Sequence, residues 1–348
     1  MGLYIYGILR FLKIPILATM KKKVFCTRKI PDAGLQLLKD EGIEVFQWNK
    51  KNETTPGELI DHCKDCDALI VAGYSKIDAS FLNASKHLKV IALHSVGFDN
   101  VDIAEATRLK IPVGNTPDVV SNATADTAFL LMLAASRKAF FLHKRIIKGE
   151  WKHVEPTGNL GVELYGKTLG IFGLGNIGFE MAKRCKGAYD MNVIYHNRNR
   201  NEEAEKELNA EFVSFEDLLK NSDVLSVHSN LTEETKGKFN YSVFEKMKPS
   251  SIFINTARGS IHNEPDLITA LESEIIWGAG LDVTDPEPML ADNPLLNMTN
   301  VAVTPHIGTA TFETRNAMST MAAKNVIAGL KGLPIPYPVN GEIYNGKL

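Results

Sequence analysis

Short apolar runs alternate with stretches of helical periodicity over two long parts of this chain. In the first part, residues 21–116, four apolar runs predict strands and three stretches between them predict helices. The strands are expected at residues 24–27, 45–47, 68–72 and 90–93, and the helices at 33–39, 56–63 and 79–85. Strands that alternate with helices in this way pair in parallel, and the helices cover both faces of the sheet. The first part is therefore predicted to be an α/β unit.

A second alternating set extends over residues 166–306. Its strands are expected at residues 168–172, 192–196, 224–227, 252–255, 278–282 and 301–303. A last helix, residues 312–330, is too long to be an idle tail, so we expect the second unit to be inserted into the first. The predicted division places residues 20–120 and 308–348 in one doubly wound parallel-sheet domain, residues 121–307 in the other, and residues 1–19 in an extension outside the fold.

A helical stretch at the junction of the two units, residues 121–148, is unusually apolar. From Ala128 to Ala135 no polar residue interrupts it. A helix that is apolar all round is buried rather than exposed on the surface of a domain. We expect one long helix here, buried between the domains or at a subunit interface.

A glycine-rich turn begins the second unit. It follows the apolar run 168–172 and precedes a helical stretch, and its glycines have G-x-G-x-x-G spacing: Gly173, Gly175 and Gly178, with Asn176 and Ile177 between the last two. A strand, this spacing and a helix together are typical of a dinucleotide-binding turn, in which a pyrophosphate lies at the helix N-terminus. The turn predicts that the two parallel-sheet domains are Rossmann-like and that residues 121–307 form the dinucleotide-binding domain.

The residues after the strand 192–196 favour one dinucleotide over the other. NAD sites usually place an acidic residue about 20 positions past the last glycine, where it binds the ribose. This chain has Asn197, Arg198 and Arg200 in that region instead. Guanidinium groups bind a 2′-phosphate through charge-assisted hydrogen bonds. The preferred cofactor is therefore predicted to be NADP(H), with NAD(H) possible; the alternative is that both arginines are solvated loop charges.

Composition excludes some classes of partner. The chain has 348 residues, enough for two domains, of which 44% are hydrophobic and 23% charged. Its formal net charge of −2 provides no attraction to nucleic acid or to an anionic membrane. We expect neither as a partner, and an anionic substrate must be held by local groups.

The first 19 residues are apolar but carry Arg10 and Lys13 in the middle. These charges cut the apolar run too short for a spanning helix, and a secretory signal would place them before its apolar core. We expect an extension that starts upstream of the fold, since Met20 precedes a good first strand. A membrane-surface anchor is the alternative.

Four cysteines in a chain of this length indicate free thiols in a reducing compartment, so a cytoplasmic protein is expected. Cys63 and Cys66, beside His62, resemble half of a metal or redox site. No second cysteine pair completes a zinc site, and the run leads directly into an apolar strand. We therefore expect no metal site.

Polar residues follow three strands of the second unit. Arg258 follows the strand 252–255, Glu287 the strand 278–282, and His306 the strand 301–303. Open parallel sheets bind ligands beyond the carboxyl ends of their strands, so these side chains are expected to converge. Each of these residues alone is more often an ordinary loop residue. Because all three follow strand ends after a dinucleotide turn, together they predict a catalytic site.

The three side chains match the needs of hydride transfer to a 2-keto acid. A guanidinium such as Arg258 holds a carboxylate and polarises a carbonyl. The imidazole of His306 ionises near neutral pH and can supply a proton, and Glu287 beside it would favour and orient the imidazolium.

With these motifs the chain resembles the D-2-hydroxyacid dehydrogenase family, and within it most resembles the glyoxylate/hydroxypyruvate reductases. The resemblance covers about residues 20–340 and includes the 173–178 turn, Ala257-Arg258-Gly259, Gly280-Leu281-Asp282-Val283 and Thr304-Pro305-His306-Ile307-Gly308. Two segments depart from the family pattern: Thr284-Asp285 and His262-Asn263-Glu264. Neither departure removes a catalytic residue.

The resemblance implies roles for individual residues. It implies that Arg258, Glu287 and His306 are catalytic, that Val96 and Gly97 hold the substrate carboxylate together with Arg258, and that the cofactor contacts include Thr124, Ala257 and Asp282. It also implies a homodimer in which the helix 121–148 packs against its mate.

The predicted function is NADPH-dependent reduction of a small 2-keto acid, glyoxylate or hydroxypyruvate, to the D-2-hydroxy acid, with His306 as proton donor. One alternative is another 2-keto acid such as 2-ketogluconate. A second is a nucleotide-sensing binding protein on the same fold, which acts like a corepressor; intact Arg258, Glu287 and His306 argue against it.

Overall fold

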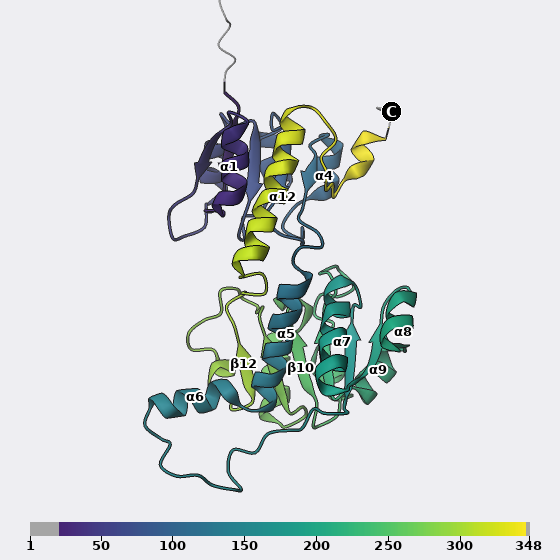
Figure 1. Ribbon diagram of the computed structural model, residues 1–348. Helices are drawn as coiled ribbons and strands as arrows, with labels where there is room; N and C mark the ends of the chain where they lie inside the picture. Colours follow the sequence, from purple (N-terminus) through teal and green to yellow (C-terminus); the bar gives the residue numbers. More distant parts are fainter. Residues whose placement is uncertain (1–20, 346–348) are drawn as a thin grey trace, which may run out of the picture.

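Two parallel sheets organise the computed structural model, which describes residues 21–345 (Figure 1). The first sheet has the strand order β2-β1-β3-β4-β5 and every pairing in it is parallel. Its strands are β1 (Lys23–Cys26), β2 (Glu44–Gln47), β3 (Ala68–Val71), β4 (Val90–Leu93) and β5 (Val113–Gly114). The expected α/β fold with two parallel-sheet domains is confirmed.

The second sheet has the strand order β12-β11-β10-β9-β6-β7-β8, again with parallel pairings throughout. Its strands are β6 (Thr168–Phe172), β7 (Asn192–His196), β8 (Glu211–Phe212), β9 (Val224–Val227), β10 (Ile252–Asn255), β11 (Gly278–Leu281) and β12 (Val301–Val303). The order reverses between β6 and β9. This is the switch point at which doubly wound sheets bind their ligands.

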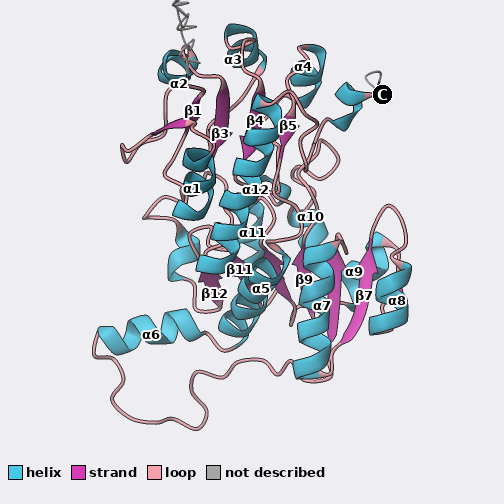
Figure 2. Ribbon diagram, turned by 45° about the horizontal axis from the view of Figure 1, so that its top comes forward, coloured by secondary structure: helices cyan, strands magenta, loops and turns pink. Residues whose placement is uncertain are grey.

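Helices cover both sheets (Figure 2). The first domain has α1 (Asp32–Asp40), α2 (Pro56–Cys63), α3 (Ala79–Ala84), α4 (Ile103–Arg108), α12 (Phe312–Leu330) and the 3₁₀ turn η3 (Gly341–Tyr344). The second has α5 (Ser121–Ser136), α6 (Ala139–Ile147), α7 (Asn176–Tyr189), α8 (Glu202–Leu208), α9 (Phe215–Asn221), α10 (Tyr241–Phe244), α11 (Glu264–Glu272) and the 3₁₀ turns η1 (Gly259–Ile261) and η2 (Pro294–Asn297).

The last long helix returns to the first sheet, as expected. α12 packs against α1 and β4 (Figure 1). The Gly34 N–H donates a 3.1 Å hydrogen bond to Ser319 Oγ, and a side chain at Gly329 would run into Val90. The seven-stranded domain is therefore inserted into the five-stranded one.

The single helix expected at residues 121–148 is wrong, because the structure breaks it into α5 and α6. Lys138 adopts a left-handed conformation with φ of +56°, and the Ser136 hydroxyl donates back to the Leu133 carbonyl. α5 is buried against the second sheet and α7, whereas α6 has no buried residue. The chain turns where burial ends, since the apolar run 128–135 packs against the sheet and the next residues leave it.

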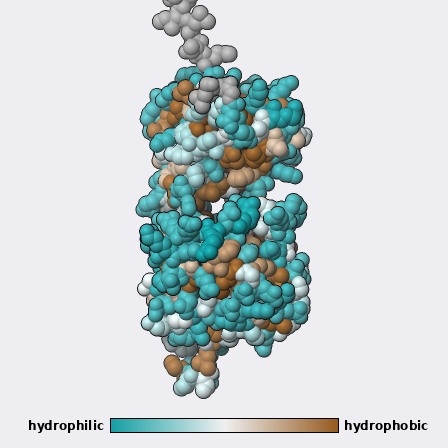
Figure 3. Space-filling model, turned by 90° about the vertical axis from the view of Figure 1, so that its right-hand side faces the viewer, coloured by the Kyte–Doolittle hydropathy of each residue, from teal (hydrophilic) through white to brown (hydrophobic). Residues whose placement is uncertain are grey.

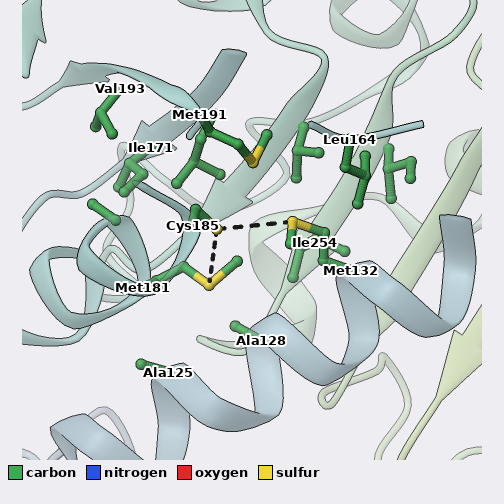
Figure 4. Packing of buried hydrophobic residues seen from close by; sticks show 14 of the residues in the cluster. Ala125, Ala128, Met132, Leu164, Ile171, Met181, Cys185, Met191, Val193 and Ile254 are labelled. Carbon is green, nitrogen blue, oxygen red and sulfur yellow. Dashed lines mark hydrogen bonds between the residues drawn. The ribbon is translucent and has the colours of Figure 1, made fainter. Parts of the chain in front are cut away.

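The packing of α5 on α7 holds the start of the dinucleotide turn in place (Figure 4). Cys185 Sγ lies 3.9 Å from the sulfurs of Met132 and Met181, in a core that also includes Ala125 and Ala128. The alanines allow close approach of the two helices, and the sulfur-bearing side chains fill the space between them. α7 is thus anchored along its buried face while its N-terminus stays open.

The expected N-terminal extension, residues 1–19, lies outside the described residues. Within residues 21–345, no helix combines the length and the apolar character needed to cross a membrane.

Candidate active site

The carboxyl ends of both sheets face one another, and side chains from the two domains touch there. Arg258, after β10, bonds to Asp99, after β4, and Tyr74, after β3, bonds to Glu287, after β11. In the space-filling view the surface is indented between the two halves of the molecule (Figure 3). The strand ends of one domain therefore meet those of the other around a common cleft.

His306 and Glu287 form an ion pair in this cleft. His306 Nδ1 lies 2.6 Å from Glu287 Oε1, and the side chains are 37% and 19% exposed. A hydrogen bond this short between an imidazole and a carboxylate fixes the orientation of the ring. Nε2 of His306 bonds to no residue among 21–345, so it is the ring atom free to exchange a proton with a ligand.

Asp282 supports the loop that carries His306. Its carboxylate accepts hydrogen bonds from Thr304 Oγ1 and from the N–H groups of Ile307 and Gly308, all at 2.7–2.8 Å. The side chain is buried, and burial raises the pKa of its carboxyl even though these donors lower it. Asp282 thereby helps hold His306 in a conformation with φ of +52°. Its cofactor contact stays a prediction.

The guanidinium of Arg258 is held at two of its nitrogens. Nε donates to Asp99 at 2.9 Å, and Nη1 donates to the Ala257 carbonyl at 2.7 Å. Nη2 has no partner among the described residues and lies against Gly97, where a Cβ would be only 1.7 Å away. Only glycine leaves room for the guanidinium there, and the N–H groups of Nη2 have no partner among residues 21–345.

The backbone of Arg258 is supported from below by Asn255 and His262. Asn255 Nδ2 donates to the Arg258 carbonyl at 2.8 Å and lies 3.0 Å from His262 Nδ1. Burial lowers the pKa of His262 to about 4, so its ring is neutral at pH 7 and Nδ1 accepts. His262, a departure from the family pattern, thus takes part in positioning the arginine loop.

Val96 and Gly97 offer backbone donors beside Arg258. The Val96 carbonyl accepts from Asn115 and the Gly97 carbonyl from Ser95 Oγ, both at 2.8 Å. Their N–H groups donate to no residue within 21–345. Two free amides beside a free guanidinium nitrogen make a suitable site for a carboxylate.

Tyr74 contacts the His306–Glu287 pair and was not among the predicted site residues. It follows β3, whose carboxyl end lies at the same edge of the sheet as that of β4. The rule that ligands gather beyond parallel strand ends, applied to the first sheet as well as the second, would have indicated it.

The glycine turn has the geometry of a phosphate site. Gly173 has a φ of +96°, which favours glycine, and its Cβ would strike the Ser229 backbone at 2.6 Å. At Gly175, the N-cap of α7, nothing lies within 4 Å of the point where a Cβ would stand, and no side chain caps the helix. The open space and the uncapped N–H groups fit the phosphates of a dinucleotide.

Asn197, Arg198 and Arg200 have different environments. Asn197 accepts from the Leu174 N–H at 2.6 Å and donates to its carbonyl at 3.1 Å, so it holds the glycine turn. Arg200 pairs with Glu205 through two hydrogen bonds of 3.0 and 2.7 Å. Arg198 is exposed and makes no ion pair within residues 21–345. Of the two arginines, Arg198 therefore has the guanidinium available to a ligand.

The other predicted cofactor residues lie around the same cleft. Thr124 is buried at the start of α5, close to Gly308. Asn176 donates to Asp118 at 2.8 Å from the first turn of α7, where Ile177 and Gly178 follow it. The Ala257 N–H donates to Asn255 Oδ1 at 3.0 Å. All of them lie at the carboxyl ends of strands or at a helix N-terminus.

The segment with Cys63 and Cys66 is part of the core. Both cysteines are buried, burial raises the pKa of Cys66 to about 11, and His62 stacks on Phe25 with ring centroids 4.9 Å apart. Residues 21–345 contain no group of three or more His, Cys, Asp or Glu side chains that could hold a metal ion.

Comparison with known proteins relates this site to a family. Residues 129–308 match the family model for the NAD-binding domain of D-isomer specific 2-hydroxyacid dehydrogenases. A glyoxylate reductase from Pyrococcus furiosus is 44% identical over 328 residues, which cover 93% of this chain and 97% of that relative.

Solved structures agree with this relationship. The TT0316 protein from Thermus thermophilus superimposes with a TM-score of 0.84 at 39% identity, covering 91% of this chain and 99% of the other. An NADPH-dependent glyoxylate/hydroxypyruvate reductase from Sinorhizobium meliloti, in complex with NADP and malonate, has a TM-score of 0.79 at 30% identity and covers 92% and 97%. By sequence and by fold, this chain belongs to the D-isomer specific 2-hydroxyacid dehydrogenase family of enzymes.

Proposed function

We propose that this chain uses NADPH to reduce a small 2-keto acid, glyoxylate or hydroxypyruvate, to the D-2-hydroxy acid. Relatives named glyoxylate reductase at up to 44% identity support the substrate class. The observation that carries the proposal is that the short His306–Glu287 ion pair and Arg258, whose Nη2 has no partner among residues 21–345, both lie where the strand ends of the two domains meet. A proton donor and a carboxylate binder are the two groups that this reduction requires.

The substrate carboxylate binds to the Val96 and Gly97 amides and to Arg258. These donors come from both domains, so they converge only when the domains are together. The planar guanidinium also lies where it can polarise the neighbouring carbonyl. Asp99 and Ala257 hold the guanidinium in one plane and thereby orient the substrate.

His306 donates the proton from Nε2 to the carbonyl oxygen as the alcohol forms. When bound, reduced nicotinamide supplies the hydride. Glu287 stays hydrogen-bonded to Nδ1 and keeps Nε2 directed at the substrate during the transfer. In the oxidising direction the neutral ring accepts the proton, and its optimum is expected at higher pH.

NADPH is preferred over NADH because residues 197–201, directly after β7, include two arginines and no acidic residue. Arg198 binds the 2′-phosphate directly, while Arg200, paired with Glu205, contributes less. The relative in complex with NADP supports a cofactor of this class.

The enzyme acts as a homodimer. α6 and the loop after it, together called the arm (residues 139–165), expose apolar side chains, with Ile147 73% and Val154 81% exposed. Hydrophobic residues are visible on the projection at the foot of the molecule (Figure 3). An exposed apolar patch of this kind supports a second copy as its partner.

Two further predictions belong to this proposal. The domain division at residues 120/121 and 307/308 is supported by the packing of α5 on the second sheet and of α12 on the first. The expected location in the cytoplasm is supported by the four free, buried cysteines.

Steady-state oxidation of NADPH and NADH with glyoxylate, hydroxypyruvate, pyruvate and 2-ketogluconate tests the proposal. We expect the highest kcat/KM with NADPH and one of the two smallest acids. Preference for 2-ketogluconate would replace the substrate, and a clear preference for NADH would refute the cofactor assignment. No turnover with any keto acid would favour the nucleotide-sensing scaffold.

A further inference from the structure

Tyr74 joins the first domain to the proton-donor pair of the second. Its phenol oxygen hydrogen-bonds to Glu287 Oε1 and lies 2.9 Å from His306 Nδ1. Its ring meets the imidazole edge-on, with centroids 5.9 Å apart and planes at 61°. Tyr74 follows β3, whereas Glu287 and His306 follow β11 and β12. The contact therefore crosses the cleft and exists only when the domains are together.

Counting the hydrogens assigns the donors. His306 Nδ1 carries one hydrogen, directed at Glu287 Oε1 across 2.6 Å, and the phenol carries one hydrogen of its own. Glu287 is the group of the three that accepts from both. Burial, and next the hydrogen bond to Glu287, raise the pKa of Tyr74 well above its usual value, so the phenol stays a donor at working pH. Imidazolium and phenol thus share one carboxylate oxygen.

Other charges around the cluster come from the remaining strand ends. Arg258, after β10, lowers the pKa of Tyr74, and Asp282, after β11, raises it. His306 in turn lowers the pKa of Asp282. These groups are held by their own hydrogen bonds, Arg258 by Asp99 and Asp282 by the 304–308 loop. Removing the Tyr74 hydroxyl therefore changes the hydrogen bonding of Glu287 and leaves these supports in place.

We propose that Tyr74 is a positioning residue for the proton donor: its phenol, carried by the first domain, donates to Glu287, fixes that carboxylate and shares its Oε1 with the His306 imidazole. As a mechanism this rests on the proposed function, since it concerns the same reduction. A carboxylate that accepts from two donors holds the imidazolium proton less tightly than one that accepts from a single donor. Tyr74 thus makes His306 a better acid and keeps the Glu287 side chain in one rotamer.

Tyr74→Phe tests this in the full-length enzyme, because it removes the hydroxyl and keeps the ring. We expect kcat for keto-acid reduction to fall by about 3- to 30-fold, with the dissociation constant for NADPH unchanged. The high-pH limb of the kcat profile should move to higher pH, since Glu287 then retains the proton on His306 more strongly. Tyr344→Phe is the matched control: it removes a phenol that accepts from the Ile335 N–H in the same domain.

A double-mutant cycle separates positioning from a general structural loss. If Tyr74 acts through Glu287, Tyr74→Phe should have almost no further effect on kcat in a Glu287→Gln background. Losses that multiply in the double variant, with the same kcat profile at every pH, would overturn the proposal.

A measurement independent of turnover distinguishes this proposal from the proposed function. The chain has nine histidines, and in protein with ¹³C-labelled histidine the His306 signal is the one absent from His306→Ala. We expect it to titrate at higher pH in Tyr74→Phe than in the wild type and in Tyr344→Phe. Identical titrations in all three would refute the role of Tyr74. A shifted titration in an enzyme that reduces no keto acid would support the coupling and refute the proposed function.

Discussion

Arg258 donates from Nε to Asp99 Oδ1 at 2.9 Å, across the cleft between the two domains. With the second bond, from Nη1 to the Ala257 carbonyl, this leaves Nη2 beside Gly97 with no partner among residues 21–345. An arginine held at two nitrogens loses little freedom when its third binds a ligand, so its geometry is preorganised. The first domain thus sets the orientation of a residue that the second domain carries.

Gly97→Ala should displace the Arg258 guanidinium from its position beside Gly97. The new methyl would lie 1.7 Å from Nη2, so Arg258 must move out of the carboxylate site. We expect kcat/KM for the keto acid to fall by about 100-fold or more, with thermal stability nearly unchanged. Gly57→Ala is the control, since a Cβ there meets nothing within 4 Å. A normal kcat/KM in Gly97→Ala would mean that the substrate carboxylate does not bind beside Gly97 and Arg258.

The two arginines after β7 should not be equivalent. Arg198→Ala should weaken NADPH binding by about tenfold or more and leave NADH nearly unaffected, because it loses a charge-assisted bond to the 2′-phosphate. Arg200→Ala should have the smaller effect on NADPH, because Glu205 already holds Arg200. Fluorescence titration of each variant with both nucleotides measures this. Equal losses for NADPH and NADH in Arg198→Ala would mean that the residue does not read the phosphate.

The exposed arm should form the dimer interface. Ile147→Asp places a charge on the more exposed of the two isoleucines that end α6 and should shift the protein toward monomer in sedimentation velocity. Leu333→Asp, at an exposed leucine outside the arm, should leave the sedimentation coefficient unchanged. A monomeric wild type, or equal behaviour of the two variants, would contradict the arm's role.

The thiols should be unreactive in the native protein. Burial raises the pKa of Cys66 to about 11 and that of Cys26 and Cys185 to about 12, and Cys63 is raised further. At pH 8 the protonated forms dominate, and only the thiolate is nucleophilic. A disulfide reagent should label four thiols rapidly in denaturant and none at a comparable rate in the native state. Fast native labelling would reopen the redox interpretation of the Cys63–Cys66 segment.

Local patterns predicted much of this fold. The buried strands read directly as apolar runs, because parallel strands covered on both faces carry hardly any polar residues; β4, β9 and β12 have the expected bounds. The two-residue strands β5 and β8 were not predicted, since their pairing depends on neighbouring strands rather than on their own sequence. The break at Lys138 was missed for a similar reason: residues 139–147 keep helical periodicity, and only tertiary packing determines where the helix leaves the sheet.

The site residues that follow strand ends were predictable from one rule, that parallel sheets bind ligands beyond the carboxyl ends of their strands. Strand ends after a dinucleotide turn indicated Arg258, Glu287 and His306, and the structure places all three at the cleft. The same rule indicates that Tyr74 lies at the strand ends but not which side chain it meets. The partners of Tyr74 and Asp99 were not predictable, because they lie far along the chain. The pairing of Arg200 with Glu205 depends on the turn that leads into α8, which the charge pattern alone does not specify.

Single-turnover reduction of glyoxylate by enzyme preloaded with NADPH, compared between wild type and His306→Ala, tests the central claim most directly. Because Nε2 of His306 supplies the proton, the alanine variant should lose about 10²- to 10⁴-fold in the rate of NADPH oxidation while binding NADPH as tightly as before. An undiminished rate in His306→Ala would contradict the account.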